Sequence, residues 1–192
     1  MTPGEPIRVL LNAIAPLPEE AMEAMLADWR EVRFKRNEIL TQPGQVQRDM
    51  LFILEGLQRS YYIKDGKEHV IAFTYPPSFS GIPESFLTQQ PSRYFLQALT
   101  DGKMLKLPWE RLEAIAQAHP SVERLLRLAT AQVLGGLVQR HYELLALSSE
   151  ERFVAFMERS AHLINLVPHK QIASYLGMDP TNFSKLLNSR KL

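Results

Sequence analysis

The 192-residue sequence contains no cysteine. This absence excludes disulfides, thiolate-bound metal ions, iron–sulfur clusters held by cysteine, and cysteine nucleophiles. Net charge is also scarce, because 22 Lys and Arg face 21 Asp and Glu and leave a formal charge of +1. A charge this small gives no overall signature of nucleic-acid binding. Such a function therefore depends on where the basic residues lie.

Long apolar runs are missing as well. The longest uncharged apolar-rich segment lies between Arg127 and Arg140 and is shorter than the roughly 18 residues of a membrane span. The first residues, Met1–Pro6, lack the basic-then-apolar pattern of a signal peptide. We expect a soluble, cytoplasmic protein with no membrane partner. Its hydrophobic content of 45% is typical of globular domains.

The middle of the chain alternates short β-rich runs with turn residues. The runs are Val32–Phe34, Met50–Leu54, Ser60–Ile63, His69–Phe73, Tyr94–Leu99 and Met104–Leu107. Asp65-Gly66 and Asp101-Gly102 each separate two runs and are typical of hairpin turns, because glycine tolerates positive φ. This spacing predicts an N-terminal antiparallel β-roll of the double-stranded β-helix or jelly-roll type.

Helical patterns flank the roll and fill the C-terminal part. Residues 1–32 and 109–118 are expected to be helical, and a long helix is expected from Pro120 to about Leu147. Ser148 and Glu151 have the spacing of a capping box, which predicts a new helix there. The fold class is thus α+β. The predicted domains are a sensor roll (1–118), a long dimerisation helix (119–147) and a DNA-binding domain (148–192).

The segment 168–188 predicts a helix-turn-helix. Ile172 and Leu176 would face the core, and Gly177 would end the first helix in a left-handed conformation. Asp179 would cap the second helix, with Pro180 at its first position. The alternative is an ordinary helical hairpin, but here the cap, glycine and apolar spacings all agree.

Polar and basic side chains occupy the outer side of this motif. The residues expected to contact double-stranded DNA are Lys170, Thr181, Asn182, Ser184, Lys185, Asn188 and Arg190. Short polar and basic groups of this kind can meet base edges and phosphates. For Arg190, a place in a solvated tail is an equal alternative to a DNA contact.

The long helix carries a heptad-like apolar stripe. Leu126, Val133, Leu137 and Leu144 follow alternating spacings that suit a helix–helix seam between two copies. The alternative is that this stripe packs against the roll of its own chain. A homodimer agrees with the predicted motif, because helix-turn-helix proteins commonly bind two half-sites as dimers.

Three segments together resemble the Crp/Fnr family of transcription regulators. They are Asp49–Gly56 in the roll, Ser148–Phe153 after the long helix, and Ile172–Gly177 in the motif. The resemblance implies a cyclic-nucleotide-binding-like roll, a dimerising helix and a C-terminal helix-turn-helix, with RNA polymerase as a further partner. Because the sequence ends at Leu192, we expect a short subgroup without a β-wing after the last helix.

The resemblance also implies an effector pocket in the roll. The matching positions are Gly81, Glu84, Ser85, Ser92 and Arg93. The family's arginine position falls on Ser92, with Arg93 one residue later, and a shift of one residue reverses the face of a strand. This register disfavours the binding of cyclic AMP. A different small-molecule or nucleotide effector and a closed roll without ligand remain equal alternatives.

These patterns favour a DNA-binding regulator with no catalytic residues, no metal and no certain cofactor. One alternative is an effector-binding or protein-interaction module that has lost DNA binding. Another is a cupin-like metal enzyme on the roll, which would need clustered histidines and carboxylates. The five histidines are scattered along the chain: His69, His119, His141, His162 and His169. The enzyme is therefore disfavoured.

Overall fold

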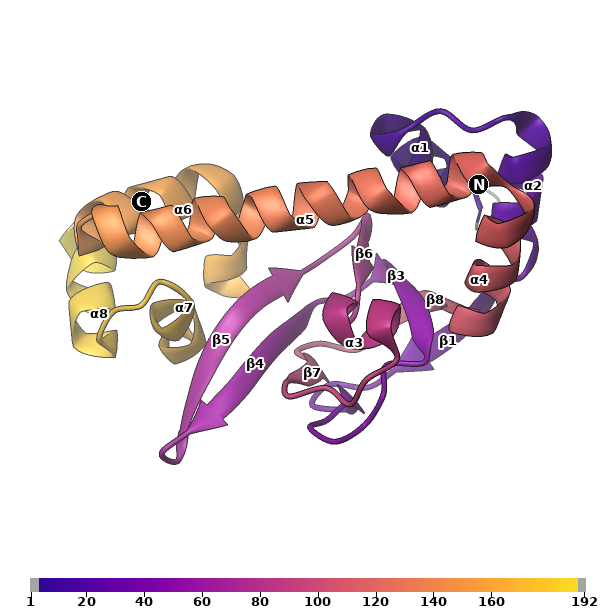
Figure 1. Ribbon diagram of the computed structural model, residues 1–192. Coiled ribbons are helices and arrows are strands. Elements are labelled where there is room, and N and C mark those ends of the chain that lie inside the picture. The colour runs from indigo at the N-terminus through magenta and orange to yellow at the C-terminus, as the bar shows by residue number, and fades with distance from the viewer. Residues whose placement is uncertain (1–3, 190–192) are drawn as a thin grey trace. The chain divides into compact units, whose positions relative to one another are not determined.

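The computed structural model describes residues 4–189 (Figure 1). The chain divides into two compact units, which are described separately below. The first comprises Met1–Ser60 and Phe73–Val133, and the second comprises Tyr61–Ala72 and Leu134–Leu192. The boundaries therefore fall inside two strands and inside the long helix. The domain boundaries expected from the sequence stay a prediction.

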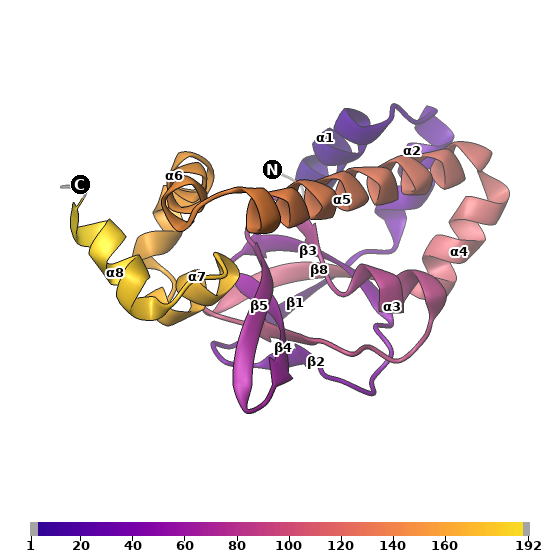
Figure 2. The ribbon, with the colours of Figure 1, turned by 60° about the vertical axis from the view of Figure 1, so that its left-hand side comes forward.

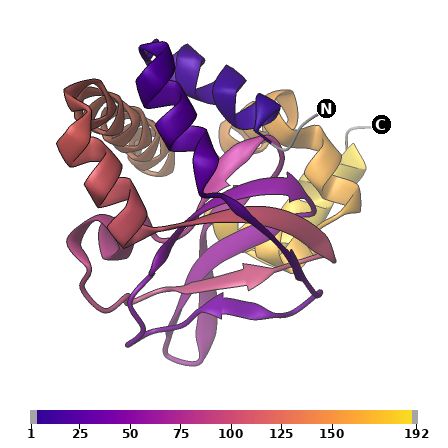
Figure 3. The ribbon, with the colours of Figure 1, turned by 90° about the vertical axis from the view of Figure 1, so that its right-hand side faces the viewer.

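Eight strands form two four-stranded sheets, seen from one end in Figure 3. The first sheet has the order β1 (Arg30–Phe34), β8 (Gly102–Pro108), β3 (Asp49–Glu55), β6 (Ser78–Ser80). The second has the order β2 (Ile39–Thr41), β7 (Phe95–Ala98), β4 (Gln58–Lys64), β5 (Lys67–Thr74). The pairs β1·β8, β3·β8, β3·β6 and β2·β7 are antiparallel. The predicted jelly-roll-like fold class is confirmed.

Alternating side chains of β3 and β8 belong to two different apolar clusters. Leu51 and Met104 pack with Leu96 of β7 in one cluster. Their neighbours Phe52 and Leu105 belong to the other cluster, because successive side chains of a strand point to opposite faces. That second cluster includes residues of α1 (Glu5–Ile14), α2 (Glu19–Ala27) and α4 (Trp109–Ala118). The strands β3 and β8 are thus buried on both faces.

One of the two predicted hairpins is wrong. Asp65 and Gly66 join β4 to β5 with φ values of 51° and 71°, as a tight hairpin turn requires. Asp101-Gly102 instead connects strands of different sheets. A Cβ on Gly102 would clash with the Glu55 carbonyl oxygen and with the Phe34 ring. This glycine is therefore present for a close approach and not for a hairpin.

Helices account for most of the remaining chain. They are α3 (Pro83–Thr88), α5 (Pro120–Ala146), α6 (Ser149–Ser160), a 3-10 turn (Ala161–Asn165), α7 (His169–Tyr175) and α8 (Pro180–Ser189). The predicted capping box is confirmed, since Ser148 Oγ accepts from the Glu151 N–H at 3.2 Å and Glu151 Oε2 accepts from the Ser148 N–H at 2.7 Å. β2, β6 and α3 were not expected. Within residues 4–189, no helix is both long and apolar enough to cross a lipid bilayer.

Candidate nucleic-acid interface

A left-handed turn joins α7 to α8 in the second unit (Figure 2). Gly177 has a φ of 62°. Its N–H donates to the Ser174 carbonyl, and the Met178 N–H donates to the Ala173 carbonyl, both at 3.0 Å. These two bonds form a Schellman motif, which satisfies the last carbonyls of a helix. The predicted glycine-ended helix-turn-helix geometry is present.

Replacing Gly177 with alanine should destabilise this turn. A Cβ there would sit 2.8 Å from Leu144 Cδ2, and the left-handed conformation costs an L-residue about 1–2 kcal/mol. We expect the free energy of unfolding in urea to fall by at least that amount. Gly135→Ala is the matched control, because its Cβ would meet nothing within 4 Å and helix propensity favours alanine by about 1 kcal/mol. Equal effects of the two substitutions would contradict the role of the turn.

The start of α8 is capped by Asp179. Its Oδ1 accepts a hydrogen bond from the Thr181 N–H at 2.7 Å. This bond from the backbone is the main reason that the pKa of Asp179 is lowered from its ordinary value. The cap is therefore ionised at neutral pH, and a carboxylate at a helix N-terminus is favourable.

The outward face of α8 is polar and open. Thr181, Ser184, Lys185 and Asn188 are all exposed and follow the i, i+3, i+4, i+7 spacing of one helical face. Asn182 lies half-buried. The structure thus brings together four of the predicted DNA contacts on one continuous surface. Lys170 is exposed on α7, and Arg190 lies outside the described residues.

The inner side of the motif fixes the orientation of α8. Ile172, Ala173, Leu176 and Phe183 have no exposed surface. The Phe183 ring meets the Phe153 ring of α6 edge-on, with centroids 5.6 Å apart. Because each of these apolar contacts is buried, rotating α8 to hide its polar face would expose them to water.

Arg152 of α6 connects the turn to the end of the long helix. Its guanidinium donates to the carbonyls of Leu147 at 2.6 Å, Leu176 at 2.8 Å and Gly177 at 3.3 Å. Only its place in the segment resembling the Crp/Fnr family marked this residue in the sequence. A charged donor on several helix-terminal carbonyls makes strong hydrogen bonds. We infer that Arg152 positions the turn.

Glu143 of α5 is a buried acid held by two arginines. Its side chain is 3% exposed and lies 3.0 Å from Nη2 of Arg159 and 3.3 Å from Nη1 of Arg140. Hydrogen bonding from Arg159 is the main reason that its pKa falls from the ordinary 4.5 to about 2. Arg140 also lies over the Tyr175 ring of α7, 4.2 Å from its centroid. This cluster joins α5, α6 and α7.

Replacing Glu143 with glutamine should destabilise the second unit. The substitution leaves Arg140 partly buried without its ion pair, and we expect a cost of about 3–5 kcal/mol at neutral pH. Since the folded pKa is depressed to about 2 from 4.5, the stabilisation is complete above the unfolded value and is lost as pH falls through this range. Urea unfolding from neutral to acid pH measures it. Glu158→Gln, at an exposed site of α6 next to Arg159 in the sequence, is the control and should change little.

Strand β5 contacts α7 within the second unit. The Ser174 hydroxyl accepts from the Val70 N–H and donates to the Glu68 carbonyl, both at 3.1 Å. More than a hundred residues separate these partners in the chain, so no local sequence pattern could have indicated the contact. The hydroxyl here replaces a missing strand partner on the edge of β5.

The predicted dimer stripe is exposed along the C-terminal half of α5. The exposed fractions of Val133, Leu137 and Leu144 are 46%, 51% and 41%. Leu126 is half-buried in the first unit. Further exposed apolar residues lie on an adjoining side of the helix: Leu134, Val138, Tyr142 and Leu145. An apolar surface of this width on one helix is typical of an interaction site.

The predicted effector residues do not gather around one cavity. Ser85 Oγ donates to the Gln90 carbonyl at 2.6 Å and accepts from the Gln47 N–H at 3.0 Å. Ser92 Oγ donates to the Tyr94 carbonyl and accepts from the Tyr94 N–H, both at 2.9 Å. Glu84 is exposed.

Arg93, which would have to hold a cyclic phosphate, is exposed and lies over the Tyr94 ring, 5.8 Å from its centroid. The two serine hydroxyls are already engaged in the internal bonds given above. This set therefore does not fit a cyclic phosphate, which needs a converging guanidinium and open donors. Of the five predicted effector residues, only Gly81 lines the apolar cavity described further below. In the described residues, no cluster of three or more histidines or carboxylates could hold a metal ion.

Comparison with known proteins gives one domain match and many similar folds. Residues 31–119 match the cyclic nucleotide-binding domain. No curated protein sequence matches the chain. FixK2 from Bradyrhizobium japonicum is 20% identical, with a TM-score of 0.74 and 84% of each chain covered.

Two further structures have similar folds. A putative transcriptional regulator of the Crp/Fnr family from Eubacterium rectale is 14% identical, with a TM-score of 0.71, 90% of this chain covered and 83% of that one. The c-di-GMP-responsive regulator CLP from Xanthomonas campestris is 16% identical, with a TM-score of 0.66, 90% of this chain covered and 91% of that one. At these identities the likeness establishes the fold.

Proposed function

Given that the chain carries a cyclic nucleotide-binding domain over residues 31–119 and has the fold of the Crp/Fnr transcription regulators, we propose that it is a DNA-binding transcription regulator. It acts in the cytoplasm as a homodimer. The two copies of α8 enter successive major grooves of one duplex. The observation that carries the proposal is the open polar face of α8 above a buried apolar underside.

The chemistry of this face suits base reading. The Lys185 ammonium can donate to guanine acceptors or to a phosphate, and the Asn188 amide can pair with adenine. The Ser184 hydroxyl donates to the Pro180 carbonyl at 2.9 Å, so its oxygen stays available as an acceptor. Thr181 places a methyl group and a hydroxyl near the helix N-terminus, where base edges are met first in this motif.

Lys170 and the predicted Arg190 are assigned to phosphate contacts. Since the described motif carries few basic residues, we expect a modest dependence of affinity on salt. The slope of log K against log salt is about −0.9 for each phosphate neutralised in B-DNA. Much of the backbone contact then comes from hydroxyls, amides and peptide N–H groups.

We propose that the apolar stripe of α5 forms the dimer seam. Leu126, Val133, Leu137 and Leu144 of one protomer would meet the same residues of its partner, as the symmetry of an isologous interface requires. An apolar helix face would then be covered, as coiled-coil pairs cover theirs.

Selection from a random duplex library tests the function directly. The purified chain should enrich a two-fold symmetric site whose half-sites are about one helical turn apart. Footprinting of the enriched duplex should show two protected major-groove segments. A folded dimer that enriches no sequence at low salt would contradict the proposal and favour a module without DNA binding.

A further inference from the structure

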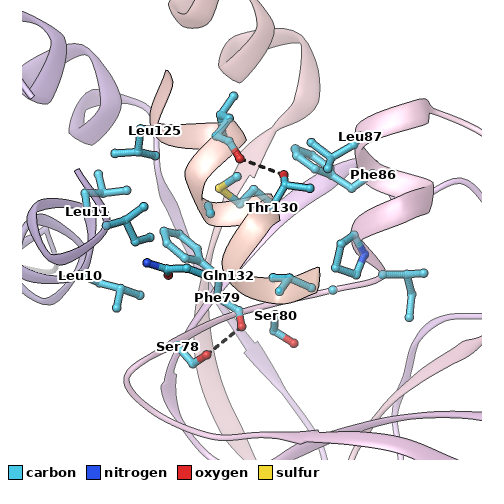
Figure 4. A pocket seen from close by; sticks show the side chains of 18 of the residues that line it. Leu10, Leu11, Ser78, Phe79, Ser80, Phe86, Leu87, Leu125, Thr130 and Gln132 are labelled. Atoms are coloured by element: carbon cyan, nitrogen blue, oxygen red, sulfur yellow. Dashed lines mark hydrogen bonds between the residues drawn. The ribbon is translucent and has the colours of Figure 1, made fainter. Parts of the chain in front are cut away.

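A cavity of about 310 Å³ opens in the first unit (Figure 4). Leu10 and Leu11 of α1 border it on one side, and Phe86 and Leu87 of α3 border it on the other. α5 crosses it with Leu125, Ala129 and Thr130, among others, and β6 contributes Ser78 to Ser80. Four segments that are distant in the sequence therefore converge on this space.

The cavity reaches the core of the unit. Leu11, Met25, Ile82, Phe86 and Leu125 all line it and are at most 5% exposed. A shallow surface groove would be lined by exposed residues only. A space of about 300–1,000 Å³ with buried apolar walls is typical of a small-molecule pocket.

The lining contains no charged side chain. Neither Asp, Glu, Lys, Arg nor His contributes to it. Three hydroxyls line it, but each is engaged internally: Ser78 donates to the Phe79 carbonyl at 2.9 Å, Ser80 to Gln58 Oε1 at 2.6 Å and Thr130 to the Leu126 carbonyl at 2.8 Å. Gln132 adds an amide. A bound ionised group would lose its hydration without gaining a partner here.

We infer that this cavity binds an uncharged, largely apolar small molecule, with one polar group near Gln132 and the β6 serines. The site is separate from the predicted cassette residues Glu84, Ser85, Ser92 and Arg93, none of which lines it. It does not depend on DNA binding. The ligand bridges α3 and β6 to α5, so that its presence ties the roll segment to the long helix.

A second copy of the chain is a weaker occupant. Of the predicted seam, only Leu126 and Val133 line the cavity, so a partner helix on that seam covers the mouth. The most deeply buried lining residues, Leu11, Met25 and Phe86, come from α1, α2 and α3 and not from the seam. The dimer therefore closes over the ligand and does not replace it.

Binding of the neutral fluorophore N-phenyl-1-naphthylamine to the full chain tests the site. We expect saturable fluorescence enhancement with one site per protomer. Ala129→Phe fills the cavity and should weaken binding by about ten-fold or more. Ala131→Phe is the matched control, because Ala131 is exposed two residues further along α5 and does not line the cavity. Its affinity should stay that of the wild type.

A second variant keeps the test valid if Ala129→Phe does not fold. Leu87 is 41% exposed at the rim, so Leu87→Glu leaves the core intact while adding a charge to an apolar opening. It should also weaken the fluorophore. Wild-type affinity in both folded variants, or an equal loss in Ala131→Phe, would overturn the site.

Competition tests the chemical class. At pH near 8, where a free fatty acid is ionised, 1-decanol should displace the fluorophore at a concentration about ten-fold or more below that of decanoate. Displacement by decanoate at equal or lower concentration would overturn the assignment to uncharged ligands. Sedimentation of the same samples reports the oligomeric state. Loss of fluorophore binding upon dimerisation would show that the partner fills the space and would also overturn the inference.

Discussion

Alanine at both Thr181 and Lys185 abolishes sequence-specific DNA binding and leaves the protein folded. Both side chains are exposed on the outward face of α8, so their removal opens no cavity. Each base contact of this type is worth about 1–3 kcal/mol of discrimination, and a dimer loses every contact twice. Four lost contacts at the lower end of this range amount to about 4 kcal/mol, so affinity for the selected duplex should drop by about three orders of magnitude or more.

Fluorescence anisotropy with the selected duplex and a scrambled duplex measures this loss. Binding to the scrambled duplex should change much less, because phosphate contacts dominate it. Lys35→Ala is the control for charge: Lys35 is 80% exposed and pairs with Asp101 in the first unit. Retention of specific binding in the double variant, with the same unfolding free energy, would remove α8 as the reading helix.

Aspartate at Leu137 converts the dimer into a monomer. Leu137 is 51% exposed in the single chain and occupies the middle of the proposed seam. Burying a leucine contributes about 1.5–3 kcal/mol, and an isologous seam loses it from both copies. Two facing carboxylates add repulsion, so the dimer dissociation constant should rise by about two to four orders of magnitude.

Sedimentation equilibrium measures the change, and Ala131→Asp provides the matched control. Ala131 is exposed on the same helix, roughly 120–160° around the axis from the seam at about 100° per residue. It should remain dimeric. A monomer from Ala131→Asp and a dimer from Leu137→Asp would move the seam to the face of Leu134, Val138 and Leu145.

Local chemistry made the C-terminal motif predictable. Gly177 was expected in the left-handed region and Asp179 at a helix cap, and both have these roles. The capping box of Ser148 and Glu151 is also present as expected. Each of these features depends on residues within four positions of one another, so the sequence contains all the information that the backbone needs.

Contacts between distant segments were not predictable in this way. The bonds from Ser174 to the β5 edge, and from Arg152 to the turn, join residues that no periodicity relates. The same reason explains the error at Asp101-Gly102. There a glycine is needed because the Glu55 carbonyl and the Phe34 ring, both distant from Gly102 in the sequence, approach it closely.

The effector site shows the limit of transferring positions by resemblance. The register argument placed Ser92 where an arginine was needed, and the structure engages that serine with the backbone of Tyr94. The apolar cavity, in contrast, combines α1, β6, α3 and α5. A sequence pattern can indicate that a helix is amphipathic. It does not indicate which apolar residues will leave a space between packed elements.

The absence of cysteine makes a direct test of the central claim simple. A single cysteine placed at Asn188, on the exposed face of α8, can carry a photoactivated cross-linker without competing thiols. On the selected duplex it should form adducts with bases in both half-sites, while a cysteine at the exposed Glu158 of α6 should not. Protection of the duplex in footprinting without any base adduct from Asn188 would contradict the account, because α8 would then not lie in the groove.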